Sequence, residues 1–247
     1  MNKIGIIGCG VIGGVMKKWL EINNKNVQIK ISDPPKNYND DLSDVEVAFI
    51  SIHIPTEKDG TQDLSLLKNI ITSLPDIPIY IRTTLLPGTC DKLSKELNKQ
   101  IYFMPEFLTE RTAYSDFCSQ PMIFTGNTEL LKAIFTGKQY IEMSNIEAEI
   151  TKYAHNVFGA VKVTYCNCIY DICQKIHCDY SKVQAGILQS GYINEPHTNV
   201  PGPDGKLGYG GKCFPKDVKA FMEYAKNYNL YKLLKITNDI NTEFRND

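Results

Sequence analysis

One cysteine of this 247-residue chain stands in a setting that favours nucleophilic chemistry. Cys213 follows the glycine-rich stretch 208–211 and is flanked by Lys212 and Lys216. Pro215 suits the first turn of a helix, so we expect the thiol at a helix N-terminus. Neighbouring lysines and a helix N-terminus lower the pKa of a thiol and favour the reactive thiolate. Cys213 is therefore a candidate nucleophile; the alternative is a structural turn with an incidental cysteine.

A lysine and an asparagine form a second candidate group. Lys152 and Asn156 are four residues apart in a segment of helical period, so their side chains project from the same face. An ammonium and an amide placed in this way could stabilise an oxyanion. The alternative is a solvated lysine beside a polar neighbour.

Other polar residues follow short apolar runs. Thr84 comes shortly after the run 79–81, and Glu106 and Glu110 come after the run 101–103. The carboxyl ends of parallel strands are where ligand sites form in α/β proteins. These residues are therefore candidates by position rather than by type.

The N-terminal segment carries a Gly-x-Gly-x-x-Gly motif between an apolar run and an amphipathic segment. In this context the glycines allow a tight turn, close approach of a pyrophosphate, and close packing of the following helix, whose N-terminus faces the anion. An aspartate twenty positions after the last glycine suits the adenosine ribose, so NAD is favoured over NADP, although a nearby lysine weakens that preference. The predicted cofactor-binding residues are Gly8, Gly10, Val11, Ile12, Gly13, Asp33 and Lys36.

The elements that must position these groups fall into two parts. Up to about residue 123, short β-branched runs alternate with helical segments, which indicates an α/β fold with a Rossmann-type doubly wound parallel sheet. From about Ser144 to Ile176 the apolar period indicates one long helix, followed by helical stretches near 181–189, 218–225 and 233–244. We expect domains at 1–143 and 144–247. The predicted strands are 4–7, 27–31, 45–52, 79–81, 101–103 and 122–124.

Composition excludes several classes of function. Lys and Arg number 27 against 28 Asp and Glu, so nothing in the net charge of -1 favours nucleic acid or an anionic membrane as a partner. No apolar run approaches the roughly 20 residues that cross a bilayer, and we expect a cytoplasmic protein. The eight cysteines are expected as thiols, and Cys166, Cys168, Cys173 and Cys178 lack paired C-x2-C spacing, so no metal site is predicted.

Most of the candidate catalytic and cofactor-binding residues named above belong to a series of six motifs along the chain. The motifs are 8–13; 54–56 with Gly60 and 63–65; 83–84 with 87–89; 105–108; 148–149 with Lys152 and Asn156; and 208–217. In this order, over nearly the whole chain, they resemble the UDP-glucose/GDP-mannose dehydrogenase family. The cysteine segment and the Pro-Glu-Phe-Leu segment at 105–108 are specific to that family. The glycines and the Lys-x-x-x-Asn pair are shared with hydroxyacid dehydrogenases.

The resemblance implies oxidation of a nucleotide sugar such as UDP-glucose at C6, from alcohol to uronic acid, with two NAD per turnover. Cys213 would form a thiohemiacetal and then a thioester, while Lys152 and Asn156 stabilise oxyanions. Glu106 would manage protons and, with Thr84 and Asp217, position the hydrolytic water. The remaining implied roles are cofactor contacts for Thr56, Thr84 and Glu110, and substrate contacts for Glu106, Phe107, Leu108, Lys152, Asn156, Tyr209 and Gly210. In the family the long helix forms a dimer core, so a homodimer is expected.

The chain departs from the family pattern at several points. Family members carry a third domain reached through a long helix, and this chain ends near the expected start of that helix. His197 stands where UDP-glucose enzymes usually carry an arginine that crosses the dimer interface, and Arg111 stands where glycine is common. Two alternatives stay open: a hydroxyacid dehydrogenase with Lys152 as base, and a non-catalytic NAD-binding or dimerisation module.

Overall fold

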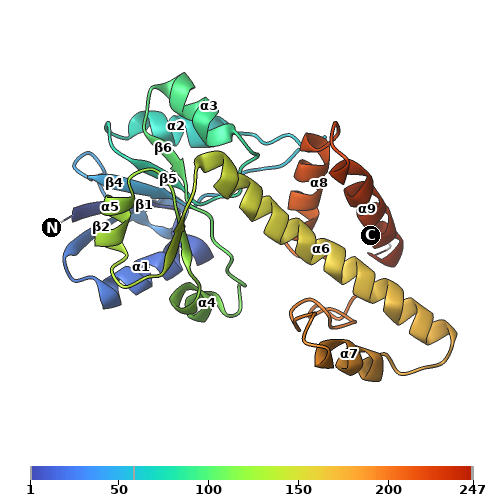
Figure 1. Cartoon of the computed structure of the whole chain (residues 1–247). Helices are drawn as coiled ribbons and strands as arrows, with labels where there is room; N and C mark the ends of the chain where they lie inside the picture. The colour runs from blue at the N-terminus through green and yellow to red at the C-terminus, as the bar shows by residue number, and fades with distance from the viewer. Residues whose placement is uncertain (1, 58, 246–247) are drawn as a thin grey trace. The chain divides into compact units, whose positions relative to one another are not determined.

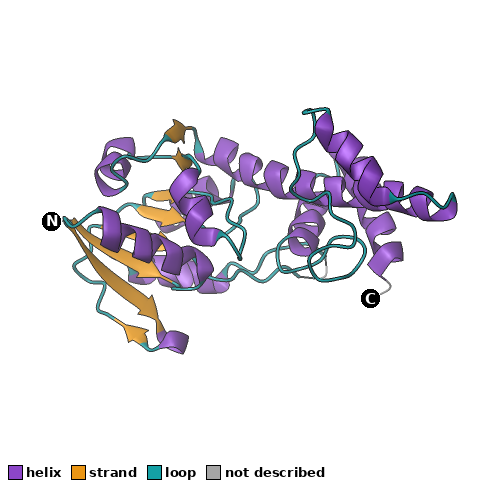
Figure 2. Cartoon of the chain, turned by 90° about the horizontal axis from the view of Figure 1, so that it is seen from below, coloured by secondary structure: helices purple, strands orange, loops and turns teal. Residues whose placement is uncertain are grey.

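A computed structural model describes residues 2–57 and 59–245, which form two compact units (Figure 1). The first unit contains the chain up to Pro55 together with Gln62–Lys152. The second contains Thr56–Thr61 and the chain from Tyr153 onward. Every strand of the described chain lies in the first unit, as the orange arrows of Figure 2 show.

A six-stranded sheet forms the centre of the first unit, in the order β3-β2-β1-β4-β5-β6. All neighbours pair in parallel except the antiparallel edge strand β3. Because β1 lies between β2 and β4, the strand order reverses there, which is the switch point where doubly wound sheets bind ligands. The predicted Rossmann-type sheet is confirmed. The strands are β1 (Asn2–Ile7), β2 (Val27–Asp33), β3 (Tyr38–Asn39), β4 (Val47–Ile50), β5 (Ile79–Ile81) and β6 (Ile101–Phe103).

Helices cover both faces of this sheet and bury two apolar clusters, one containing Ile50 and Leu67 and the other Phe49 and Trp19. The burial pattern of β4 has four consecutive buried residues, as expected for a central strand with both faces covered. The helices of this unit, besides the start of α6, are α1 (Val11–Asn23), the 3-10 turn η1 (Pro34–Lys36), α2 (Ser65–Ser73), α3 (Thr89–Leu97), α4 (Ala113–Ser119) and α5 (Thr128–Ile134).

Two local expectations for this unit are wrong. The strand β7 (Met122–Phe124) does not extend the main sheet but pairs in parallel with β8 (Tyr140–Glu142). The β-branched pattern shows that a segment is extended but not which strand it pairs with. The polar run before α2 suggests Asp63 as N-cap, yet Leu64 is at that position and the Asp63 carboxylate accepts a hydrogen bond from Ser65 N at 2.9 Å.

The second unit is helical, as its sequence indicates. It contains most of the 31-residue helix α6 (Asn145–Lys175), with α7 (Tyr180–Gln189), α8 (Phe214–Tyr224) and α9 (Leu230–Arg245). Gly159 is the one glycine of α6, and a Cβ there would lie 2.6 Å from the Phe214 ring. A glycine therefore lets the start of α8 pack closely on α6.

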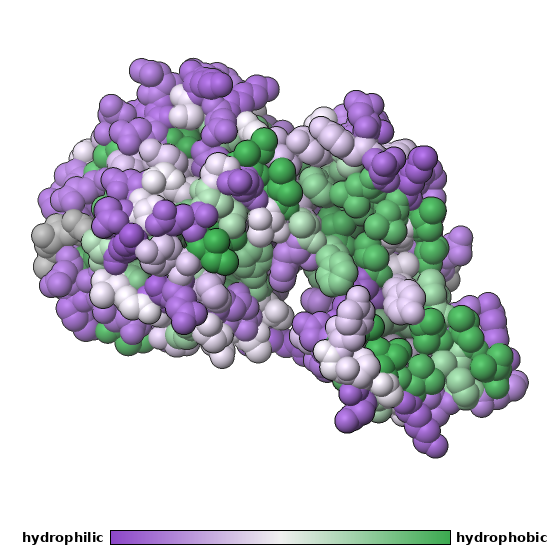
Figure 3. Space-filling model, in the orientation of Figure 1, coloured by the Kyte–Doolittle hydropathy of each residue, from purple (hydrophilic) through white to green (hydrophobic). Residues whose placement is uncertain are grey.

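Three apolar residues of α6 are exposed on the surface of this unit. Phe158, Tyr165 and Ile172 are 68%, 56% and 51% exposed and stand seven residues apart, on one side of the helix. Figure 3 shows hydrophobic residues gathered on the surface of the second unit. Among the described residues, no helix is apolar and long enough to span a membrane.

Candidate active site

The glycine motif forms a cradle at the carboxyl end of β1. Gly8 has a φ of 85°, and a Cβ there would lie 2.5 Å from the Ser51 carbonyl oxygen. A Cβ at Gly13 would lie 2.0 Å from the Gly8 carbonyl oxygen, so α1 packs against the turn only with glycine at that position. A Cβ at Gly10 would meet nothing within 4 Å, which leaves the backbone open to a ligand. These are the three roles expected of a dinucleotide motif.

The N-terminus of α1 suits an anion. Its first turn has no acidic residue, and Gly10 supplies no side-chain cap. The N–H groups of a first turn bind anions when no side chain satisfies them. Val11, which begins the helix, is partly exposed, whereas Ile12 is more buried. This open, uncapped helix start fits the pyrophosphate of a dinucleotide.

Asp33 and Lys36 frame the same turn. The Asp33 carboxylate accepts a hydrogen bond from Cys9 N at 2.8 Å, and Lys36 Nζ donates to the Cys9 carbonyl oxygen at 2.6 Å. The Lys36 ammonium lies 4.0 Å from the Asp33 carboxylate. Burial is the main reason that the pKa of the Cys9 thiol is raised. The two residues thus stabilise the turn itself, a role that the motif alone does not indicate.

Two buried hydroxyls follow β4. Ser51 Oγ and Thr56 Oγ1 are both buried and have no hydrogen-bond partner in the described structure. Buried hydroxyls ordinarily find a partner, so an orphaned one points to a ligand. Thr56 is a predicted cofactor contact. Ser51 was not singled out by the sequence, because a serine after a strand carries no distinctive signal.

Glu106 and Lys152 form a buried ion pair inside the first unit. Lys152 Nζ lies 2.9 Å from Glu106 Oε1 and also donates to the Glu106 carbonyl oxygen. Leu108 N donates to Glu106 Oε2 at 2.7 Å, and the Phe107 ring lies 5.4 Å from Lys152 Nζ. Burial by itself raises the pKa of Glu106, but the charge of Lys152, these hydrogen bonds and the charge of Arg82 outweigh it and lower that pKa. The solvated lysine considered as an alternative is excluded.

The other predicted residues of this unit are more scattered. Thr84 is buried just after β5, and its carbonyl oxygen accepts a hydrogen bond from Gln62 Nε2 at 3.0 Å. Glu110 is exposed on the segment that follows Glu106. The structure therefore joins Glu106, Lys152, Phe107 and Leu108 directly, with Thr84 at the neighbouring strand end.

Two polar side chains to which the sequence assigns no role hold the start of α6: the half-buried Asn145, and Glu149 of the motif at 148–149. Asn145 Oδ1 accepts a hydrogen bond from Phe103 N at 2.9 Å, at the end of β6. The fully buried Glu149 carboxylate accepts hydrogen bonds from Gly88 N at 2.5 Å and Cys90 N at 2.9 Å, at the N-terminus of α3. Burial is the main cause of its raised pKa. The available signal in the sequence was the motif at 148–149.

In the second unit, Cys213 is the N-cap residue of α8 and is exposed. Pro215 lies in the first turn, as predicted, and Asp217 N donates to the Cys213 carbonyl oxygen at 2.9 Å. The Asp217 carboxylate is buried and accepts a hydrogen bond from Asn156 Nδ2 at 2.6 Å and another from Lys216. A buried carboxylate therefore lies one helix turn after the thiol on α8, and an amide of α6 holds it in place.

A cavity of about 300 Å³ adjoins this turn within the second unit. Tyr209 and Gly210, both predicted substrate contacts, line it, together with His197, Phe214 and Arg245. A Cβ at Gly210 would lie 2.5 Å from the Arg245 guanidinium, which explains this glycine. Burial raises the pKa of Tyr209 to about 12, and its hydroxyl has no hydrogen-bond partner in the described structure.

The loop that carries this cavity is held by two asparagines absent from the sequence predictions. Asn167 on α6 accepts a hydrogen bond from Gly208 N at 2.9 Å. Asn241 on α9 accepts from Tyr209 N at 2.6 Å and donates to the Tyr209 carbonyl oxygen at 3.2 Å. Asn241 follows Leu234 and Thr237 on the buried face of α9, and a polar residue at such a position was the available signal.

Residues 21–142 match the NAD binding domain, and residues 146–243 the central domain, of the UDP-glucose/GDP-mannose dehydrogenase family. The chain belongs to that family. The matched N-terminal domain uses NAD as its cofactor.

Individual relatives agree with this assignment. A UDP-glucose 6-dehydrogenase of Rickettsia felis is 29% identical over 219 residues, which cover 80% of this chain and 48% of the relative. The chain spans about half the length of such curated relatives. A UDP-glucose dehydrogenase structure from Pyrobaculum islandicum has a TM-score of 0.83 at 19% identity, covering 98% of this chain and 68% of the other. A GDP-mannose dehydrogenase structure from Pseudomonas aeruginosa has a TM-score of 0.65 at 22% identity, with the same coverage of each chain.

The eight cysteines of this family member form no disulfide within the described residues. The described part of the chain also brings together no group of three His, Cys, Asp or Glu that could hold a metal ion. Cys166, Cys168 and Cys173 lie on α6, and Cys178 follows it. Burial is the main cause of the raised pKa of each of the three thiols on α6.

Proposed function

We propose that the chain oxidises C6 of a nucleotide sugar of the UDP-glucose type to the uronic acid, with NAD as oxidant and Cys213 as nucleophile. The observation that carries this proposal is the exposed thiol at the N-cap of α8, one helix turn before the buried Asp217, which Asn156 of α6 binds. A simple hydroxyacid dehydrogenase has no use for this thiol. Family membership supports the same reaction class.

The first half-reaction converts the C6 alcohol to an aldehyde, and Cys213 acts in the second. The thiolate adds to the aldehyde carbon, forming a C–S bond and an alkoxide. Lys152 and Asn156 stabilise this oxygen, because a cation and an amide N–H placed beforehand are worth most where charge develops. Loss of hydride from the same carbon leaves a thioester on Cys213. Addition of water and departure of the thiolate then release the acid.

Glu106 handles the protons of this sequence. Its pKa is lowered, so it is ionised near neutral pH and can accept a proton. It takes a proton from the C6 hydroxyl, passes it to solvent, and later takes another from the hydrolytic water, which Thr84 and Asp217 help to position. Lys152 keeps this carboxylate charged between the two steps.

The cofactor is held by the glycine cradle. Gly8, Gly10 and Gly13 would bring the backbone to the pyrophosphate, Val11 and Ile12 would supply first-turn amides, and Asp33 with Lys36 would bind the ribose. Thr56, Thr84 and Glu110 are assigned to the nicotinamide end. NAD supplies a hydride acceptor, once for each half-reaction.

The cavity beside Tyr209 is proposed to receive the sugar and its phosphates. Tyr209 and Gly210 are assigned to contact the sugar, and Phe107 and Leu108 are assigned as further substrate contacts. Arg245 supplies a cation at the cavity wall, although Asp204 already binds it at 2.8 Å.

NADH stoichiometry tests the function. UDP- and GDP-sugars are offered with NAD, and NADH absorbance is compared with the sugar consumed. We expect two NADH for each sugar. One NADH would favour a hydroxyacid-type oxidation with Lys152 as base, and none with any sugar would favour a non-catalytic NAD-binding module.

We also propose a homodimer through α6. The exposed stripe of Phe158, Tyr165 and Ile172 is continued by Ile176, which is 67% exposed. Apolar residues seven apart on a helix are typical of helix pairing. Light scattering at micromolar concentration should give twice the monomer mass, and a monomer there would contradict this assembly.

A further inference from the structure

A buried arginine next to Glu106 has no role in the chemistry described so far. Arg82 follows β5 directly and is 2% exposed. Its Nε and Nη1 have no hydrogen-bond partner in the described structure, and its guanidinium lies 5.5 Å from the centre of the Phe117 ring. A buried cation with unsatisfied donors is costly unless an opposite charge compensates for it.

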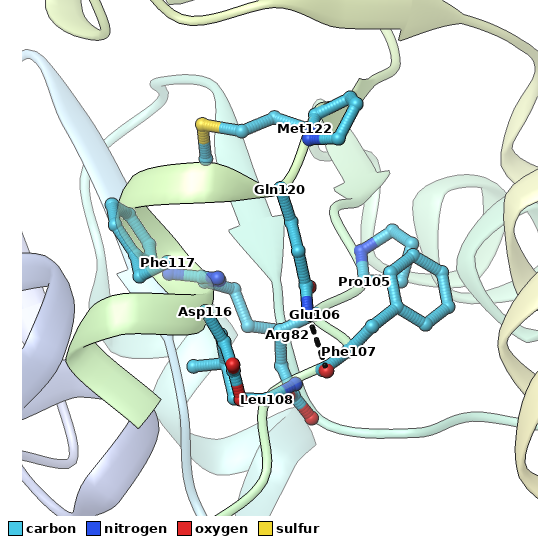
Figure 4. A pocket seen from close by; sticks show the side chains of 10 residues that line it. Arg82, Pro105, Glu106, Phe107, Leu108, Asp116, Phe117, Gln120 and Met122 are labelled. Atoms are coloured by element: carbon cyan, nitrogen blue, oxygen red, sulfur yellow. Dashed lines mark hydrogen bonds between the residues drawn. The ribbon is translucent and has the colours of Figure 1, made fainter. Parts of the chain in front are cut away.

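The compensating charge is Glu106. Arg82 and Glu106 follow the neighbouring strands β5 and β6 and line the same small cavity of about 20 Å³. Figure 4 shows the Arg82 side chain extending among Glu106, Asp116 and Phe117. Burial lowers the pKa of Arg82 to about 10, and the charge of Glu106 acts against this shift, so Arg82 is a cation at neutral pH.

The other charged groups around this cavity are engaged. Lys152 of α6 is bonded to Glu106. Asp116 of α4 accepts hydrogen bonds from Thr109 N at 2.9 Å and Thr112 Oγ1 at 2.8 Å. Glu106 therefore faces two cations, of which Lys152 is hydrogen-bonded to it and Arg82 acts through charge.

Two cations are needed if Lys152 has two tasks. In the proposed reaction Lys152 turns to the substrate oxygen, and at that moment it no longer neutralises Glu106. A buried carboxylate left without a cation would take up a proton and lose its ability to act as a base. Arg82 cannot be drawn away in the same manner, because its side chain is buried and packs on the Phe117 ring.

We propose that Arg82 is a positioning residue that keeps Glu106 ionised while Lys152 serves the substrate. The inference rests on the proposed function for the role of Glu106, but the charge coupling itself can be measured without turnover.

The test replaces Arg82 with methionine, which removes the charge and keeps an unbranched side chain, and with lysine, which keeps the charge. Lys138→Met is the matched control, because Lys138 Nζ lies 5.4 Å from the same Phe117 ring and bonds to carbonyl oxygens of α4 and the segment after it. The pKa of Glu106 is read by ¹³C NMR of labelled glutamate carboxyls, with Glu106→Gln identifying the signal.

Arg82→Met should raise the pKa of Glu106 by about 1 unit or more. The acid limb of the pH–rate profile should move by the same amount in the same direction. Arg82→Lys should restore most of the shift, and Lys138→Met should leave both readouts at the wild-type position. An Arg82→Met protein whose Glu106 titrates like the wild type overturns the proposal. A shifted NMR titration with no turnover of any sugar would support the charge coupling between Arg82 and Glu106 and refute the proposed function instead.

Thermal unfolding of the double variant Arg82→Met/Glu106→Gln tests the coupling even where Arg82→Met is too unstable for NMR titration. If the two charges attract each other, Glu106→Gln lowers the unfolding temperature less in the Arg82→Met protein than in the wild type, where it also removes the attraction to Arg82. An equal loss in both backgrounds would overturn the proposal as well.

Discussion

Asn241 offers a stability prediction whose size follows from the structure. Its side chain pairs with both the N–H and the carbonyl of Tyr209, at 2.6 and 3.2 Å. Asn241→Ala leaves these two buried backbone groups unpaired, at about 1–3 kcal/mol each. Alanine returns about 0.5 kcal/mol through its higher helix propensity. The free energy of unfolding should therefore fall by about 2–5 kcal/mol.

The matched control is Asn238→Ala, one turn earlier on α9 at a half-buried position. It makes the same change in helix propensity without touching Tyr209. Urea unfolding followed by far-UV circular dichroism should show the Asn241→Ala midpoint lower by roughly 1 M or more, at unchanged slope. Hydrogen exchange at the Tyr209 amide should accelerate in the same variant. Equal midpoints for the two variants would refute the reasoning.

Three further predictions concern the proposed chemistry. Cys213→Ser should stop acid formation and leave NAD binding unchanged. The unfolding midpoint should also stay unchanged, because the thiol is exposed. Acid production at the wild-type rate, measured by chromatography of the sugar product, would contradict this prediction. The pKa of Glu106 is lowered in the folded state, so the stability that its ionised form contributes is present above the usual pKa of 4.5 and is lost as pH falls below that value. Glu106→Gln should therefore flatten the acid limb of a stability–pH curve measured by urea unfolding. In calorimetric titrations NAD should bind at least about tenfold more tightly than NADP, a difference of about 1.4 kcal/mol. Asp33→Ser should reduce this difference in affinity. Equal affinities in the wild type would contradict the role of Asp33.

Much of the fold was predictable because its signals are local. The runs 79–81 and 101–103 are strands with the predicted ends, since β-branched residues between turn signals leave little choice of backbone conformation. The long helix runs from Asn145 to Lys175, within a residue of its expected ends, because a sustained apolar period needs no partner to be recognised. Strand pairing was not predictable from these local signals. An example is β7, which pairs with β8 and not with the main sheet.

The candidate site divides in the same way. Gly8, Gly10 and Gly13 could be assigned from the sequence, because each meets a steric requirement of the backbone within one turn. The partners of Lys152 and Asn156 could not: one turn apart on α6, they bond to Glu106 and Asp217, respectively. Those contacts join residues 46 and 61 positions apart, and no spacing rule covers them.

What the sequence by itself determined is the set of elements and the reactive groups on them. Helical period, β-branched runs and glycine turns depend on neighbours within a few residues, and so does the setting of Cys213 at the start of a helix. Only the tertiary structure decided which polar groups are buried and what charge each one meets. Arg82, Glu149 and Asn241 look ordinary in the sequence, and they matter because folding removes them from water and leaves each with a small number of partners.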